Sequence, residues 1–517
     1  MGGGLIQLVA YGAQDIYLTG NPQITFFKVV YRRHTNFSIE AIRQTLAGNA
    51  AANSTQTCTI SRNGDLVHKV WIEDSNSSCT DGEIYDYIKK VDCEIGGQLI
   101  DRQTGDWNAI WWNLTTPESK VNGLRNTFIG FSGADESNTF YYPLNFWFCR
   151  NIGLALPLIA LQYHEINLKI TYGSSIISSP SPNVWIDYIY LDTDERRRFA
   201  QVSHEYLIEQ IQRDTFNGTQ TTFNLNFNHP VKELIWVNDT TGCTETGSTF
   251  APIRCNENVI DKESGTPYAN ADNTSMRLVL NGADRFTKRK MKYFKTCQPL
   301  QHHTRCPSVG KRFTISVSAS VKDLADASKG IPLYYATKPV RLISANYAII
   351  VTDSGITMGL YSSDGGSDTN LFDTSSSAKL LTNTPSSGTS HGFNAPFTLV
   401  STDNIICIPA GKIIGLKPSS GADTLEVMIT MEFEELPLLI GGSISEDIGN
   451  IYCYSFALKP EEHQPSGTCN FSRIDSAQLI FDNNPGGSSS IPALKVFAIN
   501  YNVLRIVSGM GGLAYSN

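Results

Sequence analysis

The residues best suited to chemistry in this chain are two thiols and two imidazoles that lie close together: Cys297, His302, His303 and Cys306. Thiolate and imidazole groups are ligands that zinc prefers. Their spacing, Cys-x4-His-His-x2-Cys, differs from the paired ligands of common zinc sites, and two adjacent histidines on a strand would point to opposite faces. The pattern therefore favours packed or hydrogen-bonded side chains over a zinc site.

Two further segments carry residue types that occur at active sites. His463 follows Glu461 and Glu462, but the sequence fixes no nucleophile nearby, so a loop with solvated charges is favoured over acid–base chemistry. Residues 509–514 (Gly-Met-Gly-Gly-Leu-Ala) are similar to a dinucleotide-binding loop, yet they end three residues before the chain end. No helix can follow to hold pyrophosphate at its N-terminus, so we predict a flexible, tightly packed C-terminal tail.

The common catalytic signatures are missing from the sequence. There is no phosphate-binding loop of the Gly-x4-Gly-Lys-Ser/Thr type, no His-Glu-x-x-His and no Gly-x-Ser-x-Gly. Paired carboxylates for glycoside cleavage need not be close in sequence, but nothing indicates them. We therefore predict no catalytic, cofactor-binding or metal-binding residues, and a protein that is not an enzyme.

Composition limits the classes of protein that remain. A length of 517 residues suits two to four domains, and 41% hydrophobic residues can form sizeable cores. The net charge of −8 argues against direct binding of nucleic acid, which usually requires a basic surface. The 11 cysteines are scattered, which indicates synthesis in a reducing cytoplasm. The longest apolar stretch, around residues 152–161, is too short to cross a bilayer, so we expect no transmembrane segment.

Alternation of apolar and polar residues dominates the chain. It is clearest over residues 184–190, 313–321, 425–433 and 497–503, and it predicts strands with one buried face. Many strands separated by turn residues predict an all-β protein built from sandwiches or barrels.

Helical patterns are few. The best covers residues 107–114, where Trp107, Ile110, Trp111 and Leu114 share one helix face, with Asp106 as a cap and Pro117 as the stop. A second, weaker helical candidate covers residues 207–212.

Charged and polar segments divide the chain. The charge run at residues 192–198 predicts a solvated linker between two halves, each rich in strands. Two inserts lengthen the second half: a polar loop at residues 238–276, and residues 308–448, whose strands predict a small β domain. A Ser/Gly/Thr-rich stretch at residues 362–392 is expected to be the mobile part of that domain.

Several strings resemble one known family. They include residues 20–37 (Gly-Asn-Pro-Gln-Ile-Thr-Phe-Phe-Lys-Val-Val-Tyr-Arg-Arg-His-Thr-Asn-Phe) and residues 465–475 (Pro-Ser-Gly-Thr-Cys-Asn-Phe-Ser-Arg-Ile-Asp). Further matches lie at residues 101–107, 143–149, 227–231 and 497–517. In type and order these strings resemble the major capsid proteins of the nucleocytoplasmic large DNA viruses, such as iridoviruses, phycodnaviruses and marseilleviruses.

The resemblance implies a double jelly roll, in which two eight-stranded antiparallel sandwiches lie side by side. It further implies an N-terminal arm at residues 1–24, a first jelly roll at 25–195 and a second at 196–517. Residues 238–276 would then be the D–E loop of the second sandwich. Residues 308–448 would be its F–G insert, a β cap on the outer face that is longer than the family's basic pattern.

The family also implies a function and its partners. We expect homotrimers that form pseudo-hexameric capsomers and tile an icosahedral shell around double-stranded DNA. The expected neighbours are other capsomers, minor capsid and penton proteins, an internal viral membrane and, through the outer loops, host glycans. The protein would reside in the virion after synthesis in the host cytoplasm or virus factory. The alternative is a carbohydrate-binding or host-attachment β protein that acts through residues 308–448.

Overall fold

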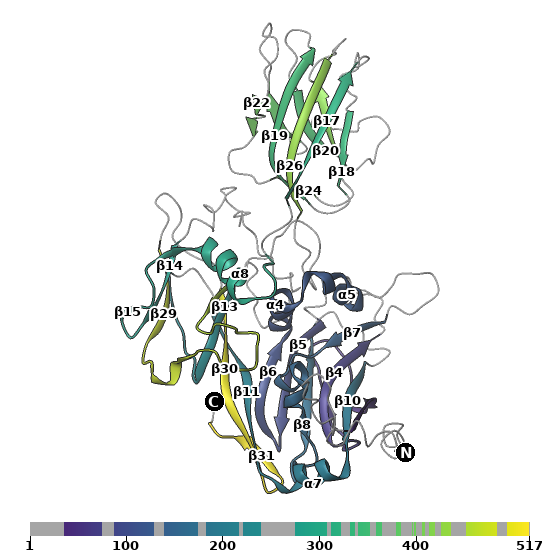
Figure 1. The fold of residues 1–517 in the computed structure, drawn as a ribbon, viewed down its shortest axis with the longest axis vertical. Helices are drawn as coiled ribbons and strands as arrows, with labels where there is room; N and C mark the ends of the chain where they lie inside the picture. Colours follow the sequence, from purple (N-terminus) through teal and green to yellow (C-terminus); the bar gives the residue numbers. More distant parts are fainter. Residues whose placement is uncertain are drawn as a thin grey trace, which may run out of the picture.

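The structure is a computed structural model with a long axis along which an upper β body projects from two sandwiches (Figure 1). It describes residues 36–74, 87–128, 139–173, 182–216, 221–238, 275–307, 312–321, 331–336, 340–351, 358–363, 379–383, 395–396, 398–399, 406–408, 413–418, 425–435, 451–482 and 494–515. The predicted arm at residues 1–24 lies outside the described residues, as do residues 239–274 of the predicted loop.

The first sandwich consists of two antiparallel sheets. Sheet 1 has the strand order β1 (Phe37–Gln44), β10 (Asn183–Leu191), β4 (Leu66–Asp74) and β7 (Phe140–Pro143), with β8 (Leu156–Pro157) beside β4. Sheet 2 has the order β2 (Leu46–Ala47), β3 (Thr55–Thr59), β9 (Ile166–Tyr172), β5 (Ile88–Ile95) and β6 (Gln98–Thr104). Side chains from alternate positions of both sheets, such as Val70, Ile186 and Leu168, fill the core between them.

The second sandwich follows in the chain and is also antiparallel. Sheet 3 has the order β11 (His204–Phe216), β30 (Leu494–Val507), β13 (Pro230–Asn238) and β27 (Tyr452–Ser455), with β28 (Cys469–Asn470) and β31 (Met510–Leu513) at its sides. Sheet 4 has the order β12 (Thr222–Asn224), β29 (Ala477–Asp482), β14 (Ser275–Leu280) and β15 (Ala283–Asp284), with β16 (Arg289–Lys290) beside β14. Its core includes Leu234, Trp236 and Val496.

Strand order is the same in the two sandwiches. When the main strands of each are lettered B to I in chain order, sheets 1 and 3 both read B-I-D-G, and sheets 2 and 4 both read C-H-E-F. Even the short strand after G pairs with D in both: β8 with β4, and β28 with β13. The four sheets stand side by side in Figure 1, with sheet 1 on the right and sheet 4 on the left.

The insert forms two more sheets. Sheet 5 has the order β17 (Arg312–Val321), β26 (Leu425–Glu435), β19 (Val340–Val351) and β22 (Ala395–Pro396), with β24 (Ile406–Ile408) beside β19. Sheet 6 has the order β18 (Ile331–Tyr335), β25 (Ile413–Pro418), β20 (Met358–Ser363), β21 (Lys379–Asn383) and β23 (Thr398–Leu399). Rings of Phe313 and Phe433 from sheet 5 contact Tyr334 from sheet 6. Residues 379–383 lie in the stretch expected to be mobile, yet they form strand β21.

Helices are short and lie at the ends and flanks of the sandwiches. They are α4 (Gly105–Thr115), α5 (Glu118–Phe128), α6 (Trp147–Arg150), η1 (Ile152–Leu154), α7 (Thr193–Gln201), the π-helix η3 (Tyr293–Cys297), α8 (Gln298–His302) and η4 (Phe471–Arg473). The predicted helix at residues 107–114 is confirmed as part of α4. Its cap is the Thr104 hydroxyl, which accepts a hydrogen bond from the Trp107 N–H, whereas we predicted Asp106.

One local prediction was wrong, and a second gave the place of a segment but not its helical conformation. Residues 207–212 belong to β11, which pairs with β30 without a register shift, so sheet hydrogen bonds outweigh the weak helical pattern. The charge run at residues 192–198 is, as predicted, a solvated segment between the two strand-rich halves, and most of it is the exposed helix α7, capped by Asp192. Its acidic first turn and basic last turn both suit the helix dipole, which a composition-based interpretation overlooks. The predicted all-β class is confirmed.

Candidate functional site: the seam between the two sandwiches

The central part of sheet 3 is buried on both faces. One face contributes Leu234 and Trp236 to the second core, while Ile235 and Phe497 on the other face pack against α4 of the first half. We call this contact zone the seam. The rings of Trp107 and Trp111 stack with centroids 5.6 Å apart, and Trp107 lies 5.6 Å from Phe497. Large apolar surfaces are thus removed from water between the two sandwiches.

Several ionised side chains are buried in the seam together with the aromatic rings. The Lys495 ammonium lies 2.9 Å from the Asp106 carboxylate, and both side chains are almost fully buried. Glu209 on β11 accepts from Arg150 at 2.7 Å and from Lys232 at 2.5 Å. The Arg150 guanidinium also lies 4.3 Å from the Trp111 ring centroid. Every one of these charges has a partner, which buried charges require if the fold is to remain stable.

Two opposing effects act on the pKa of Lys232 in the seam. Burial lowers the pKa of its ammonium group, and the neighbouring Glu209 carboxylate counteracts that effect. Since β13 has a register shift between Val231 and Glu233, Lys232 lies at a bulge in the strand. The bulge allows two consecutive charged residues, Lys232 and Glu233, to be buried within an otherwise apolar strand.

A carboxylate also joins sheet 2 to sheet 3 directly. Asp101 on β6 accepts a hydrogen bond from the Ile211 N–H of β11 at 3.1 Å, and the Gln210 side-chain amide donates to the Ile100 carbonyl. Burial raises the pKa of Asp101 to about 6, although the hydrogen bond from Ile211 and the charge of Arg150 favour its ionised form. Hydrogen bonds made by side chains therefore join β6 of the first sandwich to β11 of the second.

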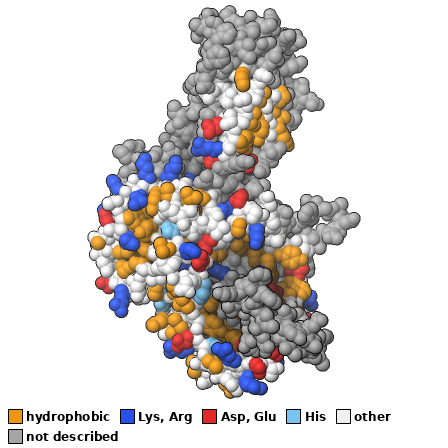
Figure 2. Space-filling model, viewed as in Figure 1, with side chains coloured by type: hydrophobic (Ala, Val, Ile, Leu, Met, Phe, Trp, Pro, Cys, Tyr) orange, Lys and Arg blue, Asp and Glu red, His pale blue; other side chains and the backbone are white. Residues whose placement is uncertain are grey.

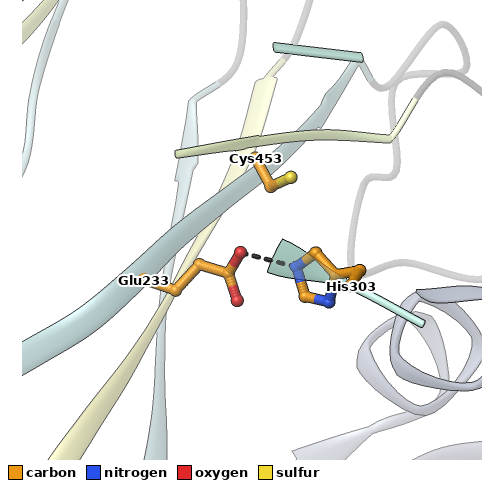
Figure 3. A group of neighbouring side chains, drawn as sticks. All are labelled: Glu233, His303 and Cys453. Carbon is orange, nitrogen blue, oxygen red and sulfur yellow. Dashed lines mark hydrogen bonds and ion pairs between the residues drawn. The ribbon is translucent and has the colours of Figure 1, made fainter. Parts of the chain in front are cut away.

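A second network with fully buried charged side chains lies at the root of the insert (Figure 3). The His303 ring donates through Nε2 to Glu233 at 2.6 Å and through Nδ1 to Glu461 at 3.0 Å. The side chains of His303 and Glu233 are fully buried. Burial alone would lower the pKa of His303, but the Glu233 charge and hydrogen bonds that include Glu461 hold it well above its usual value. The ring is therefore an imidazolium between two carboxylates.

Cys453 completes a group with ligand atoms close enough for a cation: the ligand atoms of Glu233, His303 and Cys453 lie within 4.8 Å of one another. The same three residue types form nucleophilic sites in other proteins. Here burial raises the pKa of the Cys453 thiol to about 12, so the thiolate is scarce at neutral pH. Both nitrogens of His303 carry protons, so neither offers a lone pair to a metal ion or to the thiol proton. This arrangement suits an ion-pair network.

These contacts tie together the two points where the chain enters and leaves the insert. His303 precedes the insert, and Glu461 follows it in the sequence. Next to His303, Arg305 donates to Glu118 at 2.7 Å and to Asn113 at 3.3 Å, which connects the same segment to α4 and α5. The root of the insert is therefore attached both to sheet 3 and to the first sandwich.

The side chains that the sequence suggested for zinc have separate environments. Cys297 is exposed, the His302 Nδ1 lies 3.1 Å from the Leu458 carbonyl, and the Cys306 thiol lies 3.8 Å from the Lys295 carbonyl. His302 ends α8 and His303 follows it, so the two diverge from a helix end and not from a strand.

The other two suggested segments also have structural environments. Residues 510–513 of the glycine-rich segment form β31, which pairs with β30. At its turn the Gly509 carbonyl accepts from the Tyr163 N–H at 3.0 Å, next to the first sandwich. His463 is half-buried in a segment beside the His303 network.

Sequence reasoning missed Glu233 and Cys453. The one signal for Glu233 was its presence, with Lys232, inside the strongly apolar run of residues 231–237. A charge at such a position predicts a buried partner, but not which one. Cys453 carried no signal.

Comparison with known proteins places this architecture among viral shell proteins. Two family profiles match: "Major capsid protein N-terminus" over residues 25–192, and "Large eukaryotic DNA virus major capsid protein" over residues 195–329 and 437–512. The major capsid protein of Pyramimonas orientalis virus is 40% identical over 540 residues, and that of Paramecium bursaria Chlorella virus 1 is 33% identical over 582, each alignment covering 100% of both chains. A chain of the quasi-atomic PBCV-1 virus capsid is similar in structure, with a TM-score of 0.54 and 29% identity, over 95% of this chain and 100% of that one.

The fold and these matches define a double jelly-roll protein of a viral shell. The chain belongs to the major capsid proteins of the large eukaryotic DNA viruses. The family predicted from the sequence strings is thus confirmed, together with the double jelly roll and the structural role in the capsid. Within the described ranges, no helix is both long and apolar enough to cross a membrane.

Proposed function

We propose that three copies of this chain form one capsomer, a ring of six similar sandwiches, and that capsomers tile an icosahedral shell. The observation that carries the proposal is the repeated strand order, B-I-D-G and C-H-E-F, in two sandwiches joined by a buried seam. The two similar sandwiches of one chain can occupy neighbouring positions in a ring. Three chains related by a closed cyclic symmetry then fill all six positions.

Light scattering on a sizing column tests this proposal. A species of three times the 57.0 kDa chain mass is expected, with a hexagonal outline in electron micrographs. A protein that stays a monomer at every accessible concentration would overturn it.

Within the shell we propose a purely structural role, without catalytic, cofactor-binding or metal-binding residues. The support is chemical: the one described Cys–His–Glu group is a buried ion-pair network with a protonated thiol. The relatives are likewise named for a structural role. Activity screening on glycoside and ester substrates should give no turnover above a denatured sample.

We further propose that the chain does not package the genome directly. Its net charge is −8, and on the face seen in Figure 2 the described basic side chains are interspersed with acidic ones. Other contacts would then be protein contacts: neighbouring capsomers, minor capsid and penton proteins, with a viral membrane beneath. Synthesis in the host cytoplasm or virus factory fits the free cysteines, which number seven among the described side chains.

For the domain organisation we retain the predicted division: arm 1–24, first jelly roll 25–195, second jelly roll 196–517, and inserts at 238–276 and 308–448. The sheets support it, because among the described residues no strand of sheets 1 and 2 lies beyond residue 191 and those of sheets 3 and 4 begin at residue 204. The alternative, an attachment protein, is not favoured, since the capsid relatives match the chain from end to end. Host glycans remain our proposal for the outer loops, testable by array binding of assembled capsomers.

A further inference from the structure

The outer face of sheet 1 carries apolar side chains although it lies outside the seam. On edge strand β1, Phe37 and Ile39 are 39% and 46% exposed. On the same outer face, Trp71 and Trp185 lie opposite each other on β4 and β10 and are only half-buried. Exposed apolar residues that gather on one sheet face indicate a surface that another molecule covers.

The equivalent face of sheet 3 shows what such a surface binds. One row across its strands B, I, D and G consists of Arg213, Phe497, Ile235 and Cys453. Helix α4 covers this row, because Trp107 packs on Phe497 and the Asp106 carboxylate lies 4.0 Å from Arg213. Helix α4 comes from the neighbouring sandwich, between its strands F and G.

Sheet 1 carries a matching row. Across its strands B, I, D and G, the register aligns Arg43, Trp185, Trp71 and Pro143. In both sheets the row thus begins with an arginine opposite an aromatic ring and continues with an apolar residue on strand D. The arginine is exposed in both rows. The other three residues of the row in sheet 3 are fully buried within the chain, whereas Trp185 and Trp71 of the row in sheet 1 are only half-buried. The sandwich that would cover sheet 1 in the same way is not present in this chain.

The second sandwich carries the counterpart of α4. Between its strands F and G lie η3 and α8, where Leu300 is 76% exposed. Just after strand G, Leu458 is 73% exposed. The His302 Nδ1 lies 3.1 Å from the Leu458 carbonyl, so the two leucines belong to adjoining segments. In Figure 1, α8 lies on the left of the molecule and sheet 1 on the right, so the surfaces cannot meet within one chain.

We propose that the outer face of sheet 1 docks the α8 surface, centred on Leu300 and Leu458, of a second copy of this chain. This inference rests on the proposed capsomer and deepens it, because it assigns the two surfaces that meet. The interface is heterologous: each copy contributes sheet 1 to one neighbour and α8 to the other. Repetition of such a contact closes a ring. The contact between chains repeats the seam within the chain.

The test uses the full chain with two exposed positions changed, one on each surface: Ile39→Asp and Leu300→Asp. Each should raise the dissociation constant of the three-chain species at least about 30-fold, as expected for the centre of an interface. Met510→Asp, at a site 52% exposed on β31 and outside both surfaces, is the matched control and should leave assembly unchanged. Light scattering reports the mass, and circular dichroism melting confirms that each variant is folded.

Mixing the two variants distinguishes a heterologous contact from other arrangements. The Ile39→Asp chain retains an intact α8 surface and the Leu300→Asp chain an intact sheet 1, so one sound interface remains and a two-chain species should form. If the wild-type chain forms trimers but both variants do so equally well, the inference is wrong and the proposed capsomer stands. If the variants dissociate but their mixture stays monomeric, the pairing of these two surfaces is wrong. A monomeric wild-type chain would overturn both proposals.

Discussion

Sheets 1 and 3 hold the same place in their sandwiches, yet their outer faces differ in burial and in charge. The outer face of sheet 3 lies under α4 and carries paired, buried charges such as Lys495 and Glu209. The outer face of sheet 1 leaves Phe37 and Ile39 partly in water. An interface inside one chain forms during folding and can bury charges whose partners are always present. A surface that is buried only on assembly is exposed to water in the free chain and must be compatible with a soluble protein.

The difference teaches how one fold unit serves two kinds of contact. Apolar contacts and an arginine are common to both faces, while the ion pairs Lys495–Asp106 and Lys232–Glu209, in which both partners are buried, lie in the seam within the chain. Four substitutions test this contrast, from the largest expected effect to the smallest.

Trp107→Ala should have the largest effect on the isolated chain. The ring is completely buried on Phe497, so its removal leaves a cavity and should lower the free energy of unfolding by about 3–5 kcal/mol. Trp185→Ala, at the matching place on sheet 1, removes a half-buried ring and should cost about half as much. Urea unfolding in dilute solution measures both. Equal losses would mean that sheet 1 is not the open counterpart of sheet 3.

Glu209→Gln should have the next largest effect. It leaves Arg150 and Lys232 close together without their carboxylate, at a cost of about 3 kcal/mol. The matched control is Glu205→Gln on the same strand, because Glu205 pairs with Arg505 on β30 in an exposed position and should cost less than about 1 kcal/mol. Urea unfolding measures the loss of unfolding free energy for both variants. Similar losses would show that burial of the seam charges does not increase their effect on stability.

His303→Gln should destabilise by about 2 kcal/mol at pH 6, since it removes the cation between Glu233 and Glu461. The folded-state pKa lies above the unfolded value of about 6.5, so the stabilisation is complete below that pH and is lost as the pH rises through the folded-state pKa. The gap between variant and wild type should therefore narrow in alkaline solution. His302→Gln, next to it on α8, is the control. A gap that stays constant between pH 6 and pH 10 would contradict an imidazolium at this position.

Asp101→Asn should have the smallest effect, visible mainly as a change in pH dependence. The folded-state pKa of about 6 lies above the unfolded value of about 3.9, so ionised Asp101 destabilises the fold above pH 6. Stability should rise by about 1–2 kcal/mol as the pH falls from 7 to 4 in the wild type relative to the variant. Chemical unfolding at several pH values measures the difference. Parallel profiles for the two proteins would show that Asp101 is not buried at the junction of β6 and β11.

Local pattern predicted the elements that local chemistry decides. The alternation over residues 313–321 and 425–433 corresponds to β17 and β26, and the apolar stripe from Trp107 to Leu114 corresponds to α4. It failed at residues 207–212, where pairing with β30 sets the conformation, and at residues 192–198 it predicted the solvated linker but not its helical conformation. Both cases concern short segments in which propensity is weak and context decides.

The sequence by itself determined the all-β class, the helix at α4 and, through its characteristic strings, the capsid family. These properties reside in the side-chain period of each strand and in short motifs, which need no knowledge of distant partners. Only the tertiary structure decided which charges are buried together. Asp106 and Lys495 are 389 positions apart, and His303 meets carboxylates 70 residues before it and 158 residues after it. A charged residue in an apolar run predicts a buried partner, but only the tertiary structure determines which residue that partner is.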